Sequence, residues 1–180
     1  MNSKLKVMKG NLLDFAEQGH FNIIVQGCNC FCTMGSGIAR EIRERYPEAF
    51  RADQLTKPGD YTKLGNWSQC EAGDFVDPQT YMTRNKYAEN DPKRFTIINA
   101  YTQYGFNKGG SNTDVFEYTS FELILQKLGH EHPQSHFGFP RIGQGLAGGD
   151  SVTITEMLMN FAEVISITGG SATLVEFSQP

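Results

Sequence analysis

The chain has 180 residues, of which 39% are hydrophobic and 20% are charged, and its formal net charge is −4. This composition is ordinary for a globular protein and argues against disorder, and the length fits a single domain that spans residues 1–180. Lysines and arginines are scattered along an acidic chain, which argues against a groove for long nucleic acids. The composition does not exclude a small anionic ligand, because backbone N–H groups and helix termini bind phosphate without a basic domain.

No apolar run reaches the length of a membrane span, and residues 1–10 lack the apolar stretch of a signal peptide. We therefore expect a cytoplasmic protein with no membrane partner. Neither a disulfide framework nor a zinc site fits so few cysteines, so we expect free thiols. The cysteines are Cys28, Cys30, Cys32 and Cys70. No acidic or histidine cluster has metal-ligand spacing, so no metal and no cofactor are expected.

Short apolar runs bounded by turn residues alternate along the chain with segments of helical periodicity. Strands are predicted at residues 5–8, 22–26, 63–70, 95–101, 135–139 and 172–177. Helices are predicted at residues 12–18, 37–46, 121–128 and 154–165. The polar segment 71–94 is interpreted as a surface excursion. This alternation predicts an α/β fold, with helices on both faces of a mixed, mainly parallel sheet.

Two further local signals concern the ends of helices. Pro47 predicts a break or a new turn after the helix that contains Ile42 and Tyr46. Thr153 and Glu156 have the spacing of a capping box and are predicted to open the last helix.

Two glycine-rich loops, residues 27–39 and 140–150, each leave a predicted strand and enter a predicted helix. Ligands of open α/β sheets bind at the carboxyl ends of strands, where such loops lie. Glycines let a ligand approach the backbone closely, and a helix N-terminus offers unpaired N–H groups to an anion. The pair of loops therefore predicts a diphosphate held between them.

The common nucleotide and hydrolase motifs are missing from these loops. There is no G-x-x-x-x-G-K-[ST] for a P-loop and no G-x-S-x-G elbow. Gly35 and Gly37 lack the third glycine of a dinucleotide fingerprint.

The combination instead resembles the macrodomain family over nearly the whole chain. The most specific segment is Pro-Arg-Ile-Gly-Gln-Gly-Leu-Ala-Gly-Gly-Asp at residues 140–150. Further matching segments are residues 9–12, 28–30, 34–39, 46–47, 59–65, 98–103 and 173–177. The sequence is similar to the branch that holds ADP-ribose-1''-phosphate phosphatases and ADP-ribose deacylases, with many phage and bacterial members. The resemblance implies a three-layer α/β/α fold.

The resemblance also implies a set of ligand-binding residues. Asn11 stands where the family has an Asp that holds the adenine amino group, and the backbone at Leu12 would position the base. Phe177 would stack on adenine. The first phosphate loop would comprise Gly35, Ser36, Gly37 and Ile38, and the second Gly143, Gln144, Gly145 and Leu146.

Two residues are the catalytic candidates that the resemblance implies. Asn29 would orient the distal ribose, and Asp150 would activate a water or receive a proton. The alternative role of Asp150 is the N-cap of the last helix. The chain departs from the family pattern here, because Ser151 replaces the usual Trp. The His of some family phosphatases and the Lys of the deacylases are also missing.

The leading functional expectation is a hydrolase that acts at the distal ribose of ADP-ribose, with ADP-ribose-1''-phosphate as the favoured substrate. One alternative is a non-catalytic module that binds ADP-ribose or an ADP-ribosylated protein. Another is a hydrolase of ADP-ribosyl esters.

Overall fold

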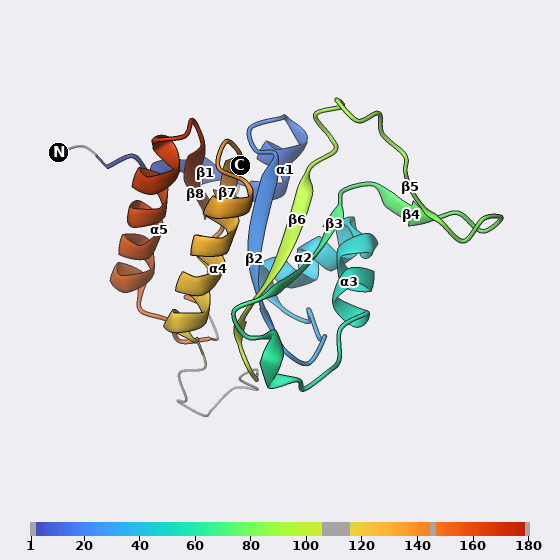
Figure 1. Ribbon diagram of the computed structural model, residues 1–180, viewed down its shortest axis with the longest axis horizontal. Helices are drawn as coiled ribbons and strands as arrows, with labels where there is room; N and C mark the ends of the chain where they lie inside the picture. The colour runs from blue at the N-terminus through green and yellow to red at the C-terminus, as the bar shows by residue number, and fades with distance from the viewer. Residues whose placement is uncertain (1–2, 106–115, 145–146, 179–180) are drawn as a thin grey trace.

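The computed structural model describes residues 3–105, 116–144 and 147–178, and Figure 1 shows a central sheet between two groups of helices. Six strands form the sheet in the order β1-β8-β7-β2-β6-β3. Their bounds are β1 Lys6–Gly10, β2 Ile23–Asn29, β3 Trp67–Glu71, β6 Thr96–Gln103, β7 His136–Phe139 and β8 Ser171–Phe177. All neighbours are parallel except β3, which pairs antiparallel with β6. The mixed, mainly parallel sheet is confirmed.

Helices cover both faces of this sheet, so the fold has the three layers that the sequence predicts. Side chains of α1 and α2, with those of α3, pack on one face, and those of α4 and α5 pack on the other. The helices are α1 Leu12–Glu17, α2 Gly37–Arg45, α3 Pro47–Gln54, α4 Tyr118–Glu131 and α5 Ser151–Ser166. No helix in the described ranges is both long and apolar enough to cross a membrane.

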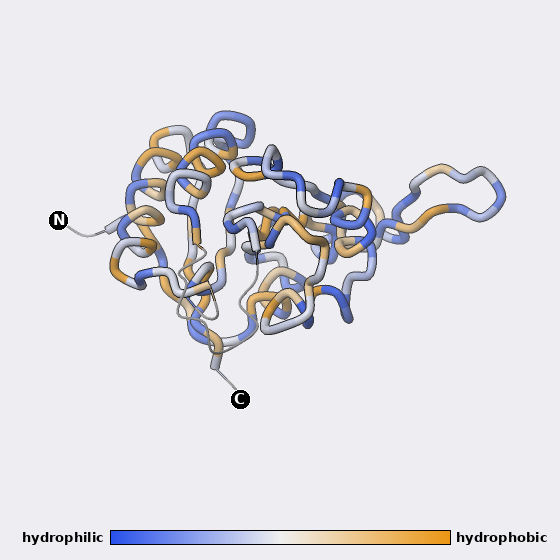
Figure 2. The backbone as a smooth tube through the Cα atoms, turned by 90° about the horizontal axis from the view of Figure 1, so that it is seen from below, coloured by the Kyte–Doolittle hydropathy of each residue, from blue (hydrophilic) through white to orange (hydrophobic). Residues whose placement is uncertain are grey.

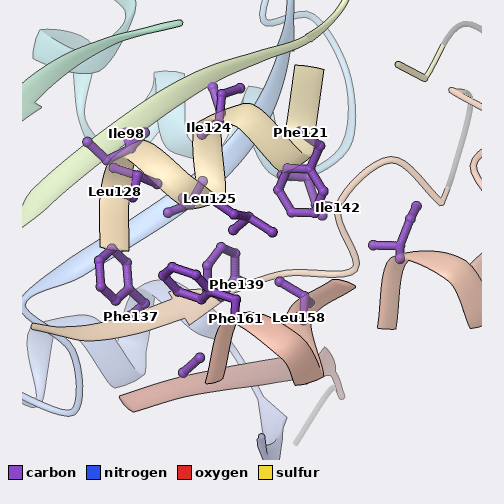
Figure 3. Close-up of a cluster of buried hydrophobic side chains, with 14 of the residues drawn as sticks. Ile98, Phe121, Ile124, Leu125, Leu128, Phe137, Phe139, Ile142, Leu158 and Phe161 are labelled. Atoms are coloured by element: carbon purple, nitrogen blue, oxygen red, sulfur yellow. The ribbon is translucent and has the colours of Figure 1, made fainter. Parts of the chain in front are cut away.

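Alternating side chains of the central strands divide the hydrophobic core into two parts. Ile23 and Val25 of β2 face the α4 and α5 side, whereas Ile24 faces α1 and α2. Figure 3 shows the first part, in which Phe161 packs against Phe137 with ring centroids 5.1 Å apart. Because both faces of the sheet are buried, the central strands are nearly continuous apolar runs in the sequence.

The polar segment 71–94 contains a small hairpin that projects from the body of the protein, as Figures 1 and 2 show. Its strands are β4 Asp74–Val76 and β5 Thr83–Asn85, which pair antiparallel. The surface excursion predicted from the sequence is thus a hairpin arm.

Three local predictions are refined or corrected by the structure. Pro47 opens a new helix, α3, at a position where its missing N–H costs no hydrogen bond. The expected strand at residues 63–70 starts only at Trp67, because Asp60 caps a 3₁₀ turn, η1, at Tyr61–Lys63. The capping box at Thr153 and Glu156 is wrong, since α5 begins earlier, at Ser151, behind a different cap residue.

Gly138 of β7 lies under Phe21, and replacing this glycine with alanine is expected to destabilise the fold. An added Cβ would lie 2.6 Å from Cδ2 of the Phe21 ring, which is closer than van der Waals contact allows. Overpacking of this kind costs about 1–3 kcal/mol, measurable by urea denaturation. The control is Gly105→Ala, where an added Cβ meets no atom of the described residues within 4 Å. Equal stability of the two variants would contradict the prediction.

Candidate ligand-binding site

A cleft of about 380 Å³ lies where β1 and β8 end and where the segment after β7 begins. Because these strands are parallel, their carboxyl ends meet at one edge of the sheet. The cleft is lined by five residues that the sequence analysis named as ligand contacts, namely Asn11, Leu12, Gly37, Ile38 and Phe177. The fold therefore brings residues from three distant parts of the chain to one cleft.

The first glycine loop presents an open helix N-terminus to this cleft. Ser36 precedes α2, and its side chain makes no capping hydrogen bond. Gly37 has a φ of +56°, and a Cβ built on it would meet no atom within 4 Å in the parts of the chain that the structure describes. The first N–H groups of an α-helix have no partner inside the helix, so this end can receive an anion. Arg43 stabilises the loop by donating a hydrogen bond from Nη1 to the Thr33 carbonyl at 3.3 Å.

Asn11 lines the cleft as expected, but its side chain already serves as the N-cap of α1. Its Oδ1 accepts hydrogen bonds from the backbone N–H of Leu13 at 2.9 Å and of Asp14 at 3.1 Å. Its Nδ2 donates to Oε1 of Glu41 at 3.0 Å. An amide oxygen has two lone pairs, so Oδ1 of Asn11 has none left for a ligand amino group.

The second glycine loop differs from the first in which of its residues line the cleft. Arg141 lines the cleft and donates from Nη2 to Oε1 of Glu176 at 2.8 Å. Gly143, by contrast, is not among the cleft-lining residues, and a Cβ on it would lie 2.3 Å from the Phe116 ring. Packing against Phe116 therefore explains this glycine without a ligand. Gln144 lies outside the cleft lining as well.

The phosphate-loop assignments divide in the same way between the two loops. Gly35 and Ser36 precede the open end of α2, and among the described residues only the Thr33 carbonyl lies within 4 Å of a Cβ built on Gly35, at 3.9 Å. Gly145 and Leu146 lie outside the described residues. Of the residues assigned to the first phosphate loop, Gly37 and Ile38 line the cleft, whereas Gly35 and Ser36 do not. From the second glycine loop, Pro140 and Arg141 line it.

The two catalytic candidates are engaged in local structure. Asn29 forms an Asx turn, with Oδ1 accepting from the N–H of Phe31 at 2.8 Å and Nδ2 donating to Oγ1 of Thr33 at 2.7 Å. Asp150 is the N-cap of α5, and its Oδ2 accepts from N and Oγ1 of Thr153 at 2.9 and 2.6 Å. The side-chain and backbone hydrogen bonds from Thr153 lower the pKa of Asp150. The N-cap alternative is confirmed, and neither residue lines the cleft.

Comparison with known proteins finds a relative that matches this chain over most of its length. It is 30% identical over 165 residues, or 91% of its length, to the uncharacterised 17.5 kDa protein of the tk-vs intergenic region of Enterobacteria phage T4, of which it covers 93%. The chain belongs to the family of this phage protein. No family model matches the sequence.

Solved structures identify the fold. The macrodomain of Mycobacterium tuberculosis DarG matches with a TM-score of 0.62 and 17% identity, over 95% of this chain and 97% of that one. A macrodomain protein from Streptomyces coelicolor matches with a TM-score of 0.58 and 16% identity, over 97% and 100%. Thermosipho africanus DarTG in complex with ADP-ribose matches with a TM-score of 0.63 and 12% identity, over 95% of this chain and 41% of that one. The chain has the macrodomain fold.

The fold also contains a buried polar cluster, apart from the residues that line the cleft, that the sequence analysis did not find. Tyr101 of β6 donates from its hydroxyl to Oδ1 of Asp53 at 2.7 Å, and Nζ of Lys63 lies 4.8 Å from the centroid of the Tyr101 ring. Burial raises the pKa of Asp53, against the lowering effects of Tyr101 and Lys63. Lys63 also donates to Oγ1 of Thr56 at 2.9 Å, so the cluster ties α3 and η1 to the sheet.

The cysteines near this cluster are free thiols, as expected. Cys28 and Cys30 are buried, and burial raises the pKa of Cys30 to about 11, so this thiol is protonated at neutral pH. The parts of the chain that the structure describes hold no group of three or more His, Cys, Asp or Glu residues placed to bind a metal ion.

Proposed function

We propose that this chain binds ADP-ribose in the cleft, with the diphosphate at the N-terminus of α2 and the adenine against Phe177. The observation that carries the proposal is the meeting of two surfaces in one cleft. Ile38, Val175 and Phe177 supply an apolar wall, and the uncapped helix end at Gly37 supplies N–H donors. An apolar ring system joined to a diphosphate fits both surfaces at once.

The exposure of Phe177 supports the assignment of the base. Phe177 ends β8, lines the cleft and is 67% exposed, so its ring is accessible to a ligand. A nucleobase stacked on such a ring gains about 1–3 kcal/mol. The Thermosipho africanus and Trypanosoma brucei proteins of the same fold were both solved with ADP-ribose bound. Their ligand is therefore the first to test on this chain.

Calorimetric titration with ADP-ribose tests the proposal. We expect one ligand to bind per chain, and we expect AMP to bind at least about tenfold more weakly, because it lacks the second phosphate that the helix end would hold. Absence of binding at millimolar ADP-ribose would contradict the proposed function. Equal affinity for AMP and ADP-ribose would contradict the placement of the diphosphate.

We further propose that the chain hydrolyses the phosphomonoester of ADP-ribose-1''-phosphate. In this proposal Asn29 orients the distal ribose and Asp150 assists the attacking water. The proposal is supported by the family resemblance of residues 140–150 and by the low pKa of Asp150, which keeps the carboxylate ionised. The product would be ADP-ribose and inorganic phosphate.

The second candidate function is a module that binds ADP-ribose, or an ADP-ribosylated protein, without turnover. The observation that favours it is that the side chains of Asn29 and Asp150 already serve an Asx turn and a helix cap. Phosphate release from ADP-ribose-1''-phosphate separates the two candidates. Binding without release of this phosphate would leave a binding module or an ADP-ribosyl ester hydrolase, which a protein-linked ADP-ribosyl ester then tests.

A further inference from the structure

Few side chains that line the cleft can accept a hydrogen bond from a ligand. The polar side chains in the lining are those of Asn11, Glu41 and Arg141. A guanidinium has only donors, so the side-chain acceptors are the amide oxygen of Asn11 and the carboxylate of Glu41. Both lone pairs of the Asn11 oxygen are used by the N–H groups of the first turn of α1.

Glu41 holds the remaining acceptor in a fixed position. It lies one helical turn after Gly37 on α2, so it borders the same cleft as the open helix end. Its Oε1 accepts from Nδ2 of Asn11 at 3.0 Å and lies 3.5 Å from Nη1 of Arg45. No hydrogen bond to its Oε2 is formed by any residue within the described ranges, and the side chain is 34% exposed.

Glu41 is not the sole ion-pair partner of Arg45. Its guanidinium also pairs with Asp14 and Glu17, each at 3.0 Å, which is closer than its 3.5 Å contact with Glu41. Three carboxylates thus share one guanidinium, and Glu41, which lines the cleft, keeps one carboxylate oxygen without a hydrogen bond from the described residues. The contacts of Asn11 and Arg45 with Oε1 orient the carboxylate, which reduces the entropy lost when a ligand binds.

We propose that Glu41 determines which base the cleft accepts. Its carboxylate accepts a hydrogen bond from the exocyclic amino group of a purine that packs on Phe177, while Asn11 orients the carboxylate instead of contacting the base. The cleft then prefers a 6-amino purine, adenine, to a 6-keto purine, whose oxygen would face the carboxylate. This inference rests on the proposed function, in which ADP-ribose occupies the cleft.

The test compares ADP-ribose with inosine diphosphate ribose by calorimetric titration of wild type and Glu41→Gln. The second ligand has a 6-keto group in place of the 6-amino group and an N1–H in place of the unprotonated N1. We expect wild type to prefer ADP-ribose by at least about tenfold, since hydrogen bonds to charged groups are the strong ones. In Glu41→Gln we expect that preference to fall to within about threefold, because an amide can donate to the keto oxygen as well as accept from an amino group. A variant that weakens both ligands equally would show a merely structural role for Glu41 and overturn the proposal.

Two further variants sharpen the result. Glu44→Gln removes a carboxylate from the same helix, where it pairs only with Arg40 among the described residues, and it should leave both affinities unchanged. Asn11→Asp keeps an N-cap acceptor but adds a second carboxylate beside Glu41, so we expect no gain in affinity for ADP-ribose. A clear gain would assign base selection to position 11 and overturn the proposal.

The failure of this inference is distinguishable from failure of the proposed function. If wild type binds neither ligand, both are overturned. If wild type binds ADP-ribose and Glu41→Gln keeps the wild-type preference, only the role of Glu41 is overturned.

Discussion

Replacing Gly37 with leucine is expected to weaken ADP-ribose binding by at least about 100-fold, since two or more hydrogen bonds to a charged diphosphate would be lost. A Cβ at this position points into open space beside the uncapped end of α2, so a leucine side chain would occupy the place assigned to the diphosphate. Titration calorimetry of the variant measures the effect directly.

The control must separate occlusion of the cleft from backbone strain. Gly37 has a φ of +56°, and any other residue there is strained. Gly169 is a matched position, since it has a φ of +96°, and a Cβ on it also meets no atom of the described ranges within 4 Å. It follows α5 and lies away from the cleft lining. We expect Gly169→Leu to lose comparable stability and to bind ADP-ribose as wild type does. Full binding by Gly37→Leu would contradict the proposed place of the diphosphate.

Periodicity and turn chemistry predict most of the architecture of this chain. The six strands of the main sheet and four of its helices are visible in the sequence, because buried parallel strands are continuous apolar runs. The sequence analysis does not predict α3, because it interprets Pro47 as a break or a new turn. Proline is in fact favourable at the first position of a helix, where Pro47 lies. The sequence analysis also does not predict that β4 pairs with β5, because strands of three residues show almost no hydrophobic periodicity.

Glycines show where sequence reasoning about the site stops. Gly37 and Gly143 both lie in loops between a strand and a helix, and both have a positive φ. Only packing separates them, because Gly37 faces open space and Gly143 lies against Phe116. The ligand loop and the tightly packed loop therefore look alike until the fold brings their neighbours together.

Glu41 illustrates a second limit of the sequence. On its own it is one more charged residue on a helix, and such residues are most often solvated. Its position beside Asn11 arises because α2 packs next to the start of α1, 30 residues earlier in the chain. The sequence shows that Asn11 departs from the Asp that the macrodomain resemblance implies, but it does not show that the Glu41 carboxylate lies beside Asn11.

Asp150 gives the sharpest test of turnover, because its two roles respond differently to two substitutions. Asparagine at position 150 still caps α5 but carries no charge, whereas alanine removes both the cap and the carboxylate. If Asp150 assists the water, phosphate release from ADP-ribose-1''-phosphate should fall by about 100-fold or more in both variants. Only Asp150→Ala should also lower the thermal midpoint, by a few degrees.

The pH profile supplies the second readout for Asp150. Hydrogen bonds from Thr153 lower its pKa, so the ionised form is present above that lowered value and is lost only as pH falls through it. Wild-type turnover should therefore persist to a pH below the ordinary titration range of an aspartate. ADP-ribose affinity should be unchanged in both variants, because Asp150 does not line the cleft. If Asp150→Asn keeps wild-type turnover while Asp150→Ala loses only stability, the residue is a helix cap alone, and any hydrolysis must be assigned to other groups.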